Sequence, residues 1–202
     1  MSYPQPCTIR YLTHPQVRID PGTDVRRWSL NAQGHARVAA LVAEPGALRA
    51  TRRVISSDET KAVETAAPLA RALGVDLEIR PLMHENDRSA TGFLPPDEFE
   101  RVADAFFANP HISIRGWERA IDAQARIVAE VNACLAAPCN GDLLIVGHGA
   151  VGTLLFCALT GIPIDRRHDQ GPGGGGCWYA FDATDRNPLH GWQPLEALHA
   201  RA

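Results

Sequence analysis

Two histidines and the chain's only lysine are the side chains with the most evident chemical potential. His14, Lys61 and His148 each lie at, or one helical turn beyond, the end of a predicted strand. Two imidazoles and one ammonium group, joined by the N-termini of the following helices, would favour a negatively charged ligand. Gly147 and Gly149 leave room for another group beside His148, which favours a functional over a structural histidine. Taken singly, His14 has a structural alternative, and Lys61 could be a solvated helix lysine.

Apolar strand-like runs alternate with helical patterns along the chain. Strands are predicted at 8–12, 53–56, 75–80, 143–146 and 177–181. Helices are predicted at 31–43, 56–73, 97–108, 117–136 and 150–159. This alternation predicts an α/β fold with three layers, a mainly parallel sheet flanked by helices. Ligands bind such sheets outside the carboxyl ends of the strands, where the two histidines and the lysine would meet.

The second predicted helix carries signals at both ends. Ser56 and Glu59 have the spacing of a capping box, which would open the helix. Gly74 is expected to end it, since glycine readily adopts the left-handed conformation of a helix terminus.

Composition and charge exclude several classes of protein. The 202 residues are 45% hydrophobic and 21% charged, as in globular proteins and unlike disordered or collagen-like chains. A net charge of −3 gives no overall basic field for nucleic acid, although a local basic patch stays open. No apolar run is long enough for a membrane span, and residues 1–8 do not resemble a signal peptide.

The cysteines and histidines predict the compartment and the absence of metal. The five cysteines are scattered and form no CxxC pair, which predicts a reducing cytoplasm without a zinc site or disulfide framework. The histidines have no metal-ligand spacing. We therefore expect a cytoplasmic protein with neither a metal nor another cofactor.

Six segments follow one another in a recognisable order. They are Ile-Arg-Tyr-Leu-Thr-His-Pro at 9–15, Leu-Asn-Ala-Gln-Gly at 30–34, Ser-Ser-Asp-Glu-Thr-Lys-Ala-Val-Glu-Thr-Ala at 56–66, Glu85, the helix that starts with Trp-Glu at 117–126, and Val-Gly-His-Gly-Ala-Val at 146–151. Together they resemble the motifs of the histidine phosphatase superfamily, the phosphoglycerate-mutase-like proteins. The resemblance covers most of the chain. It implies a single domain over 1–202 with a short lid segment at about 86–116.

The resemblance also implies a role for each matching residue. His14 would be the nucleophile that becomes phosphohistidine, and His148 would flank the transferring phosphoryl group. Glu85 would protonate the leaving oxygen, while Lys61 would hold phosphate oxygens, with Gly149 also beside the phosphate. These steps are chemically consistent, because a neutral imidazole can attack phosphorus and leave again while cationic donors neutralise the oxygens.

An acid at position 85 must carry a proton before it can give one. Glu85 therefore needs a raised pKa, and repulsion by Asp58, Glu59 and the phosphate itself would raise it. Without this role, Glu85 would be a solvated loop acid.

Three positions depart from the family pattern. Thr13 stands where the first motif has arginine, Pro15 where it has glycine, and Lys61 where the second motif has arginine. A guanidinium grips two phosphate oxygens at once, whereas an ammonium is a point charge. Thr13 either donates a hydrogen bond to the phosphoryl group or merely packs.

Another arginine could replace the missing ones. Arg18 lies in the loop after His14 and is the candidate replacement for phosphate binding. Its alternative is an ordinary surface arginine. Arg88, which follows Glu85 closely, is a second basic residue in reach.

The predicted lid is rich in phenylalanine. The residues expected to pack its helix onto the body are Phe99, Phe106 and Phe107. Phe93 and Leu94, just before two prolines, are the candidates for the pocket mouth. An apolar rim there would suit a substrate with an aromatic or lipid-like part.

The main interpretation is a metal-independent phosphatase that hydrolyses a phosphomonoester or a phosphorylated protein through phospho-His14. A short lid leaves the pocket open, which favours hydrolysis over a mutase. The alternative is a catalytically weakened relative that binds a phosphorylated or other anionic ligand, or a protein partner. Mutase-type phosphotransfer is a minor alternative. The expected partner is a small phosphorylated substrate or a phosphoprotein, with no nucleic acid and no membrane, and the oligomeric state stays open.

Overall fold

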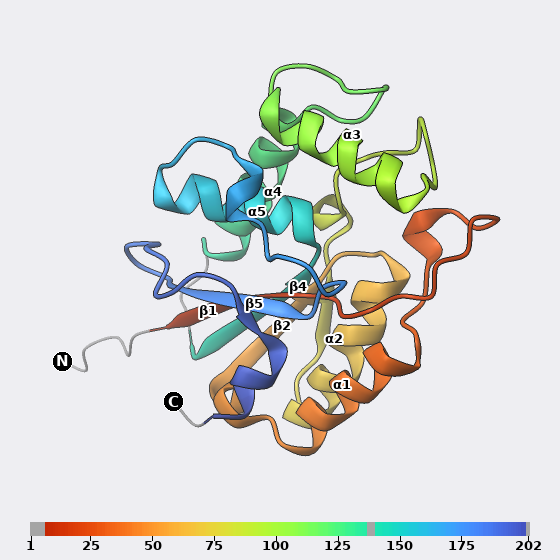
Figure 1. Cartoon of the computed structure of the whole chain (residues 1–202). Helices are drawn as coiled ribbons and strands as arrows, with labels where there is room; N and C mark the ends of the chain where they lie inside the picture. Colours follow the sequence, from red (N-terminus) through yellow and green to blue (C-terminus); the bar gives the residue numbers. More distant parts are fainter. Residues whose placement is uncertain (1–6, 137–139, 201–202) are drawn as a thin grey trace.

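A six-stranded sheet forms the centre of the computed structural model, which describes residues 7–136 and 140–200 (Figure 1). The strands are β1 (Thr8–Thr13), β2 (Thr51–Ser56), β3 (Leu77–Ile79), β4 (Asp142–Gly147), β5 (Cys177–Asp182) and β6 (Gln193–Pro194). The α-helices are α1 (Ala32–Ala43), α2 (Thr60–Leu73), α3 (Pro96–Ala108), α4 (Ala120–Cys134) and α5 (Gly149–Thr160). Short 3₁₀ helices are η1 (Val25–Arg27), η2 (Gly46–Ala50), η3 (Pro81–Met83), η4 (Arg166–His168) and η5 (Leu195–His199).

The strand order confirms the predicted α/β fold with a mainly parallel sheet. The order is β3-β2-β4-β1-β5-β6. The first four of these strands run parallel to their neighbours, whereas β5 is antiparallel to β1 and β6 is antiparallel to β5. The carboxyl ends of β1, β2 and β4 therefore meet at one edge of the sheet.

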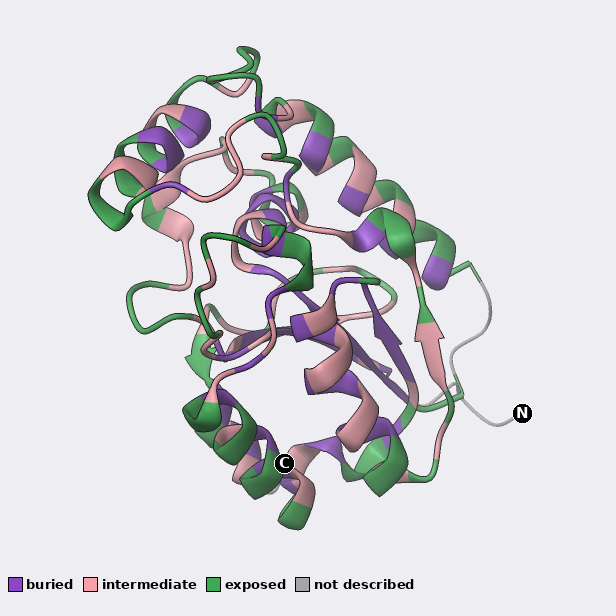
Figure 2. Cartoon of the chain, turned by 90° about the vertical axis from the view of Figure 1, so that its right-hand side faces the viewer, coloured by how far each residue is buried: buried purple, intermediate pink, exposed green. Residues whose placement is uncertain are grey.

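Side chains alternate between the two faces of the sheet along each strand. Each face therefore contributes to a separate apolar core. Leu143 and Ile145 of β4 pack with α3, α4 and α5, while Leu144 and Val146 pack with α1 and α2. Figure 1 shows the two helix groups on opposite sides of the sheet, and Figure 2 shows the buried residues along the strands and the helix sides that face them. The continuous apolar run in β4 thus reflects a strand that is covered on both faces.

The antiparallel strand β5 brings a glycine-rich loop to the same edge. Leu12 pairs with Trp178, so β5 begins where β1 ends. The loop before β5 consequently lies against His14, and the Gly176 N–H donates to the His14 carbonyl at 2.9 Å. Gly175 has φ +90°, and a Cβ there would lie 2.2 Å from the same carbonyl oxygen, so only glycine fits.

The predicted capping box at the start of α2 is wrong. The helix begins at Thr60, its N-cap is Glu59, and no side chain caps it. Ser56 still belongs to β2, where it pairs with Val146 of β4 and Ile79 of β3. The predicted stop is confirmed, because Gly74 ends the helix in the left-handed conformation.

The cysteines differ in one place from the expectation of a reducing cytoplasm without a disulfide framework. Cys7 is disulfide-bonded, while Cys134, Cys157 and Cys177 are free. The cause of the difference is that cysteine pairing depends on distances in the fold, which scattered positions in the sequence do not reveal.

No helix in the described part of the chain is both long enough and apolar enough to cross a membrane.

Candidate active site

Three strand ends place the predicted histidines and a serine together. His14 follows β1, Ser57 follows β2 and His148 follows β4, all at the carboxyl edge of the sheet. The imidazole rings of His14 and His148 lie edge to face, with centroids 5.3 Å apart. Ser57 Oγ lies 2.7 Å from Nε2 of His148. The convergence inferred from the strand ends is therefore present in the fold.

His14 is held so that one ring nitrogen is left for chemistry. Its backbone N–H donates to the Gly147 carbonyl at 3.0 Å, which ties it to the end of β4. Its Nδ1 lies 2.9 Å from the carbonyl of Pro15, and since a carbonyl only accepts, Nδ1 carries the proton. Nε2 then keeps its lone pair. Proline in place of the motif glycine does not disturb this contact, because the backbone carbonyl is the acceptor.

The environment of His14 keeps its imidazole neutral. Loss of hydration, reinforced by the nearby His148 and Lys61, lowers the pKa of His14 to about 3. A neutral ring is the form that can act as a nucleophile.

His148 is fully buried and fixed through both its backbone and its side chain. Its N–H donates to the Tyr11 hydroxyl at 3.0 Å, and its carbonyl accepts from the same hydroxyl at 3.1 Å. With Nε2 facing Ser57, the buried Nδ1 has no hydrogen-bond partner among the described residues. Burial holds the pKa of His148 well below its usual range. Nδ1 is thus the nitrogen available to a ligand.

Glu85 lies at the N-terminus of α5, opposite the ends of the strands. Its carboxylate accepts backbone N–H groups from Val151 at 3.0 Å, Ala150 at 3.2 Å and Asn86 at 3.1 Å. Burial raises the pKa of Glu85, with repulsion by Glu59 as a smaller cause. The expected repulsion by Glu59 is therefore present as a smaller cause, and desolvation is the larger cause that the sequence did not reveal. The direction is the one that an acid needs.

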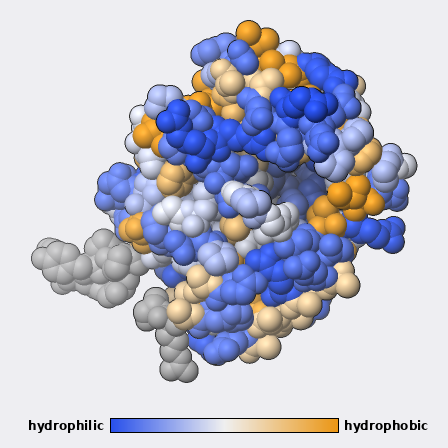
Figure 3. Space-filling view, viewed as in Figure 1, coloured by the Kyte–Doolittle hydropathy of each residue, from blue (hydrophilic) through white to orange (hydrophobic). Residues whose placement is uncertain are grey.

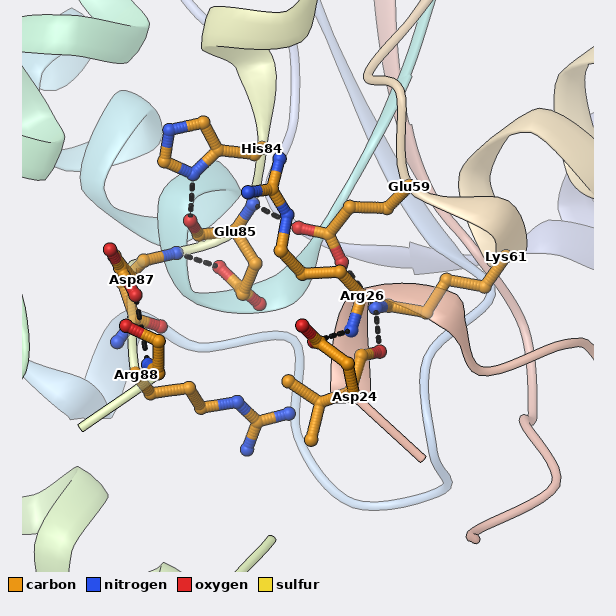
Figure 4. Close-up of a pocket in the computed structure, with 11 residues that line it drawn as sticks. Asp24, Arg26, Glu59, Lys61, His84, Glu85, Asp87 and Arg88 are labelled. Atoms are coloured by element: carbon orange, nitrogen blue, oxygen red, sulfur yellow. Dashed lines mark hydrogen bonds and ion pairs between the residues drawn. The ribbon is translucent and has the colours of Figure 1, made fainter. Parts of the chain in front are cut away.

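Lys61 does not present a free charge to the site. Its ammonium group is buried, forms an ion pair with the buried carboxylate of Glu59, and donates to the Val25 carbonyl at 2.9 Å (Figure 4). Glu59 also accepts the N–H of Glu85 at 2.9 Å and lies 3.7 Å from Nε2 of His148. The opposite charges of this pair largely cancel, so Lys61 is close to the histidines but is already occupied.

Gly149 lines the site, whereas Thr13 is fully buried and, like Arg18, lines neither cavity at this edge of the sheet. The Thr13 hydroxyl accepts from the N–H of Cys177 at 3.0 Å and lies 2.6 Å from Gln170 Oε1. Its hydrogen-bonding capacity is thus used within the protein. Gly149 begins α5 and lines the cavity beside His14. Arg18 is exposed and lines neither cavity at this edge of the sheet.

A cavity of about 770 Å³ opens beside His14 and Glu85. The glycine-rich loop at 171–175 and Arg88 form part of its wall. Helix α3 forms another part through Phe99, Phe106 and Phe107. Figure 3 shows a hollow in a mainly hydrophilic face between the α3 part and the α1–α2 part. The segment 86–116, predicted as a lid, consists of α3 and its flanking loops, and α3 stands above α4 and α5 (Figure 1).

The apolar lining comes from different residues than the sequence predicted. Phe93 packs against Trp28, with ring centroids 6.2 Å apart, and Leu94 is buried, so neither lines this cavity. Phe106 and Phe107 pack into the core as predicted and border the cavity as well. Phe99 is only partly buried and offers the more accessible ring.

Several residues of the site escaped the sequence analysis in their actual roles. Arg126 donates to the carbonyls of Leu82 at 2.7 Å and His84 at 3.0 Å and pairs with Glu118 at 2.8 Å. It thereby fastens the loop that carries Glu85. The only signal was the position of Glu118 and Arg126 within the motif at 117–126. Glu59 was visible only as a nearby acid, and the contact of Ser57 with His148 had no signal. Within 7–136 and 140–200, no three His, Cys, Asp or Glu residues are arranged to hold a metal ion.

Several solved structures share this fold. YhfR of Bacillus stearothermophilus has a TM-score of 0.76 at 19% identity, over 92% of this chain and 95% of that protein. A mycobacterial glucosyl-3-phosphoglycerate phosphatase with inorganic phosphate has a TM-score of 0.72 at 19% identity, over 93% and 94% of the two chains. A putative alpha-ribazole-5'-P phosphatase of Escherichia coli K-12 has a TM-score of 0.70 at 18% identity, over 98% and 99%. At these identities the likeness concerns the fold.

The family is shown by a sequence model. Comparison with curated proteins gives no match. The model of the histidine phosphatase superfamily, branch 1, matches residues 14–189, which include both histidines and Glu85. The chain therefore belongs to the histidine phosphatase superfamily.

Proposed function

We propose that this protein is a metal-independent phosphatase that hydrolyses a phosphomonoester through a phosphohistidine at His14. The observation that carries the proposal is the state of His14: a neutral imidazole with Nδ1 bound to the Pro15 carbonyl, 5.3 Å from the His148 ring. Its remaining nitrogen, Nε2, is the nucleophile.

The reaction takes two steps. In the first step Nε2 attacks phosphorus, the P–O bond to the leaving group breaks, and protonated Glu85 gives its proton to the leaving oxygen. In the second step water attacks the phosphohistidine, the P–N bond breaks, Glu85 takes a proton from that water, and inorganic phosphate leaves. His148 Nδ1 contacts the phosphoryl oxygens in both steps.

The cavity supports hydrolysis of a substrate larger than phosphate alone. About 770 Å³ accommodates a sizeable leaving group, and the opening admits water for the second step. Relatives of the same fold are named for phosphate esters of small molecules. We therefore favour a small phosphorylated substrate over a phosphoprotein, and hydrolysis over mutase-type phosphotransfer. We propose that the protein acts in the cytoplasm, because three of the four described cysteines are free thiols, although Cys7 is disulfide-bonded.

A second candidate function is binding of a phosphorylated or anionic ligand, or of a protein partner, with little catalysis. The observation that favours it is the pairing of Lys61 with Glu59 together with the occupied Thr13 hydroxyl, which leaves the motif positions without a free cation. Such a protein would keep the histidines but turn over slowly.

Hydrolysis of an aryl phosphate in the presence of a chelator distinguishes the two. We expect turnover by the wild type, loss of turnover in His14→Ala, and full turnover in His35→Ala, where an exposed histidine of α1 is removed. Absent turnover, or turnover that survives in His14→Ala, would favour the binding protein.

A further inference from the structure

The loop after Glu85 carries two hydrogen-bond donors that the protein itself does not use. Asn86 is 5% exposed, and its Nδ2 has no hydrogen-bond partner among the described residues. The Arg88 guanidinium has no hydrogen bond or ion pair with the described part of the chain, and it lies over the face of Phe99, 4.9 Å from the ring centroid. Both residues line the cavity that contains His14 and Glu85.

We propose that Asn86 and Arg88 bind the oxygens of the phosphoryl group and take over the work of the missing motif arginines. The proposal rests on the phosphatase function proposed above, and it names the residues that recognise the anion at that site.

The charge inventory of the site supports this assignment. Lys61 is paired with Glu59, the Thr13 hydroxyl is bound within the protein, and Arg18 is exposed outside the cavity. Arg166 lines the same cavity but is held by Glu100 and Asp104. Among the described arginines that line this cavity, Arg88 is thus the one beside Glu85 without an acidic partner within hydrogen-bond distance.

Partial burial of the unpaired Arg88 charge costs free energy, because the guanidinium loses hydration without gaining an acidic partner. A bound anion would supply that partner. Burial lowers the pKa of Arg88, which reports the same penalty on its charged form. Its planar fork can bind two phosphate oxygens at once, and Phe99 restricts its orientation by a cation–π contact. Asn86 Nδ2 and His148 Nδ1 are two further buried nitrogens without a partner among the described residues, and each can donate to a phosphate oxygen when it carries a proton.

The location of these donors has a consequence for the mechanism. Arg88 and Asn86 sit on the loop that leads from Glu85 to α3, not on a strand end. The same short segment therefore carries the acid and the phosphate-binding groups. Arg126 holds the start of that segment through the Leu82 and His84 carbonyls.

The test is binding of orthovanadate, a phosphate mimic, measured by calorimetry for four proteins. We expect Arg88→Met to raise the Kd at least about tenfold, because charge-assisted hydrogen bonds are lost. Arg88→Lys should recover only part of the affinity, since an ammonium cannot grip two oxygens. Arg49→Met, an exposed arginine before β2 at the opposite edge of the sheet, should leave the Kd unchanged.

Aryl phosphate hydrolysis by the same proteins separates the two proposals. If vanadate affinity depends on Arg88 but turnover does not depend on His14, the phosphatase function fails and the anion site stands. If turnover depends on His14 while Arg88→Met binds vanadate as tightly as the wild type, the anion site is overturned and the phosphatase stands. A wild type that does not bind vanadate would overturn the anion site.

Discussion

In the proposed mechanism His14 and Glu85 have opposite functions, but both must be uncharged for the first step. Attack needs a neutral imidazole, and protonation of the leaving oxygen needs a protonated carboxyl. Loss of hydration moves the two pKa values in the required directions, to about 3 for His14 and above the ordinary 4.5 for Glu85. Both neutral forms therefore coexist in an acidic range of pH.

This overlap predicts an acidic optimum for kcat/KM. Activity should rise as His14 loses its proton near pH 3, and fall on the alkaline side as Glu85 ionises above pH 4.5. Glu85→Gln should lower kcat/KM of an alkyl phosphate by about 10²- to 10⁴-fold and abolish the alkaline decline, because an amide does not titrate there. Rates from pH 3 to 9 test this. The variant also controls for titration of the substrate, and an alkaline decline that persists in it would contradict the assignment.

The sequence was enough to predict which residues belong to the candidate site. It was not enough to predict which side chains they contact in the fold. His14, His148 and Glu85 stand out because glycines, strand ends and motif order are visible in a sequence. The occupation of Lys61 by Glu59 is invisible, since it depends on how the turn after β2 orients two neighbouring side chains. Arg18 looked available for the same reason: sequence distance from His14 says nothing about which way a loop side chain points.

At the scale of elements, one tyrosine joins β1 to the turn between β4 and α5. The Tyr11 hydroxyl accepts from the His148 N–H and donates to its carbonyl. Close approach is possible because Gly147 and Gly152 lack side chains, and a Cβ at either would lie within 2.5 Å of the tyrosine ring or hydroxyl. The strands and helix thus fix the backbone of His148, and Ser57 fixes its ring.

Removal of this hydroxyl should affect both stability and turnover. Tyr11→Phe leaves the buried N–H of His148 without its partner, whereas the His148 carbonyl keeps the Gly152 N–H at 3.1 Å. The lost partner costs about 1–3 kcal/mol in the free energy of unfolding, and the change should lower kcat. Tyr179→Phe is the matched control, because the hydrogen bond of that hydroxyl within the described part of the chain goes to the Gly152 carbonyl at 3.1 Å and to neither histidine. Denaturant unfolding and aryl phosphate kinetics measure the two effects. Equal losses of kcat in both variants would refute a positioning role for Tyr11.

The elements themselves were largely predictable, with informative exceptions. Runs of apolar residues identified β1, β2, β4 and β5 because these strands are buried in the centre of the sheet. The strand β6 has two exposed residues, so no hydrophobic pattern marks it. The false capping box at Ser56 arose because strand pairing outweighs a local helix signal. The predicted mouth at Phe93 failed because the direction of α3, which is set by packing, decides which rings meet the cavity.

At the scale of the whole molecule, two histidines that fold in the neutral form link stability to pH. In the folded protein the pKa values of both histidines lie below the ordinary 6.5. At a pH between the folded pKa and 6.5, the unfolded chain therefore binds more protons than the folded protein does. Stability contributed by these groups is therefore present above about pH 6.5 and is lost as the pH falls. Glu85, with a raised pKa, acts in the opposite direction above pH 4.5 but is one group against two.

The free energy of unfolding should accordingly fall between pH 7 and pH 5. Each histidine contributes a slope of at most about 1.4 kcal/mol per pH unit. His14→Gln should flatten the dependence, since the amide does not titrate in this range. Urea unfolding at several pH values measures the slope. If the unfolding free energy of His14→Gln changed with pH as steeply as that of the wild type, the pKa of His14 would be the same in the folded and unfolded states, which would contradict this prediction.

Trapping the covalent intermediate tests the central claim most directly. The protein is mixed with an aryl phosphate, quenched under alkaline denaturing conditions within the first turnovers, and digested for mass spectrometry. Our account predicts one phosphoryl group on the peptide that contains His14, and none on that peptide in His14→Ala. Turnover without a phosphorylated His14, or with the phosphoryl group on another residue, would contradict the account.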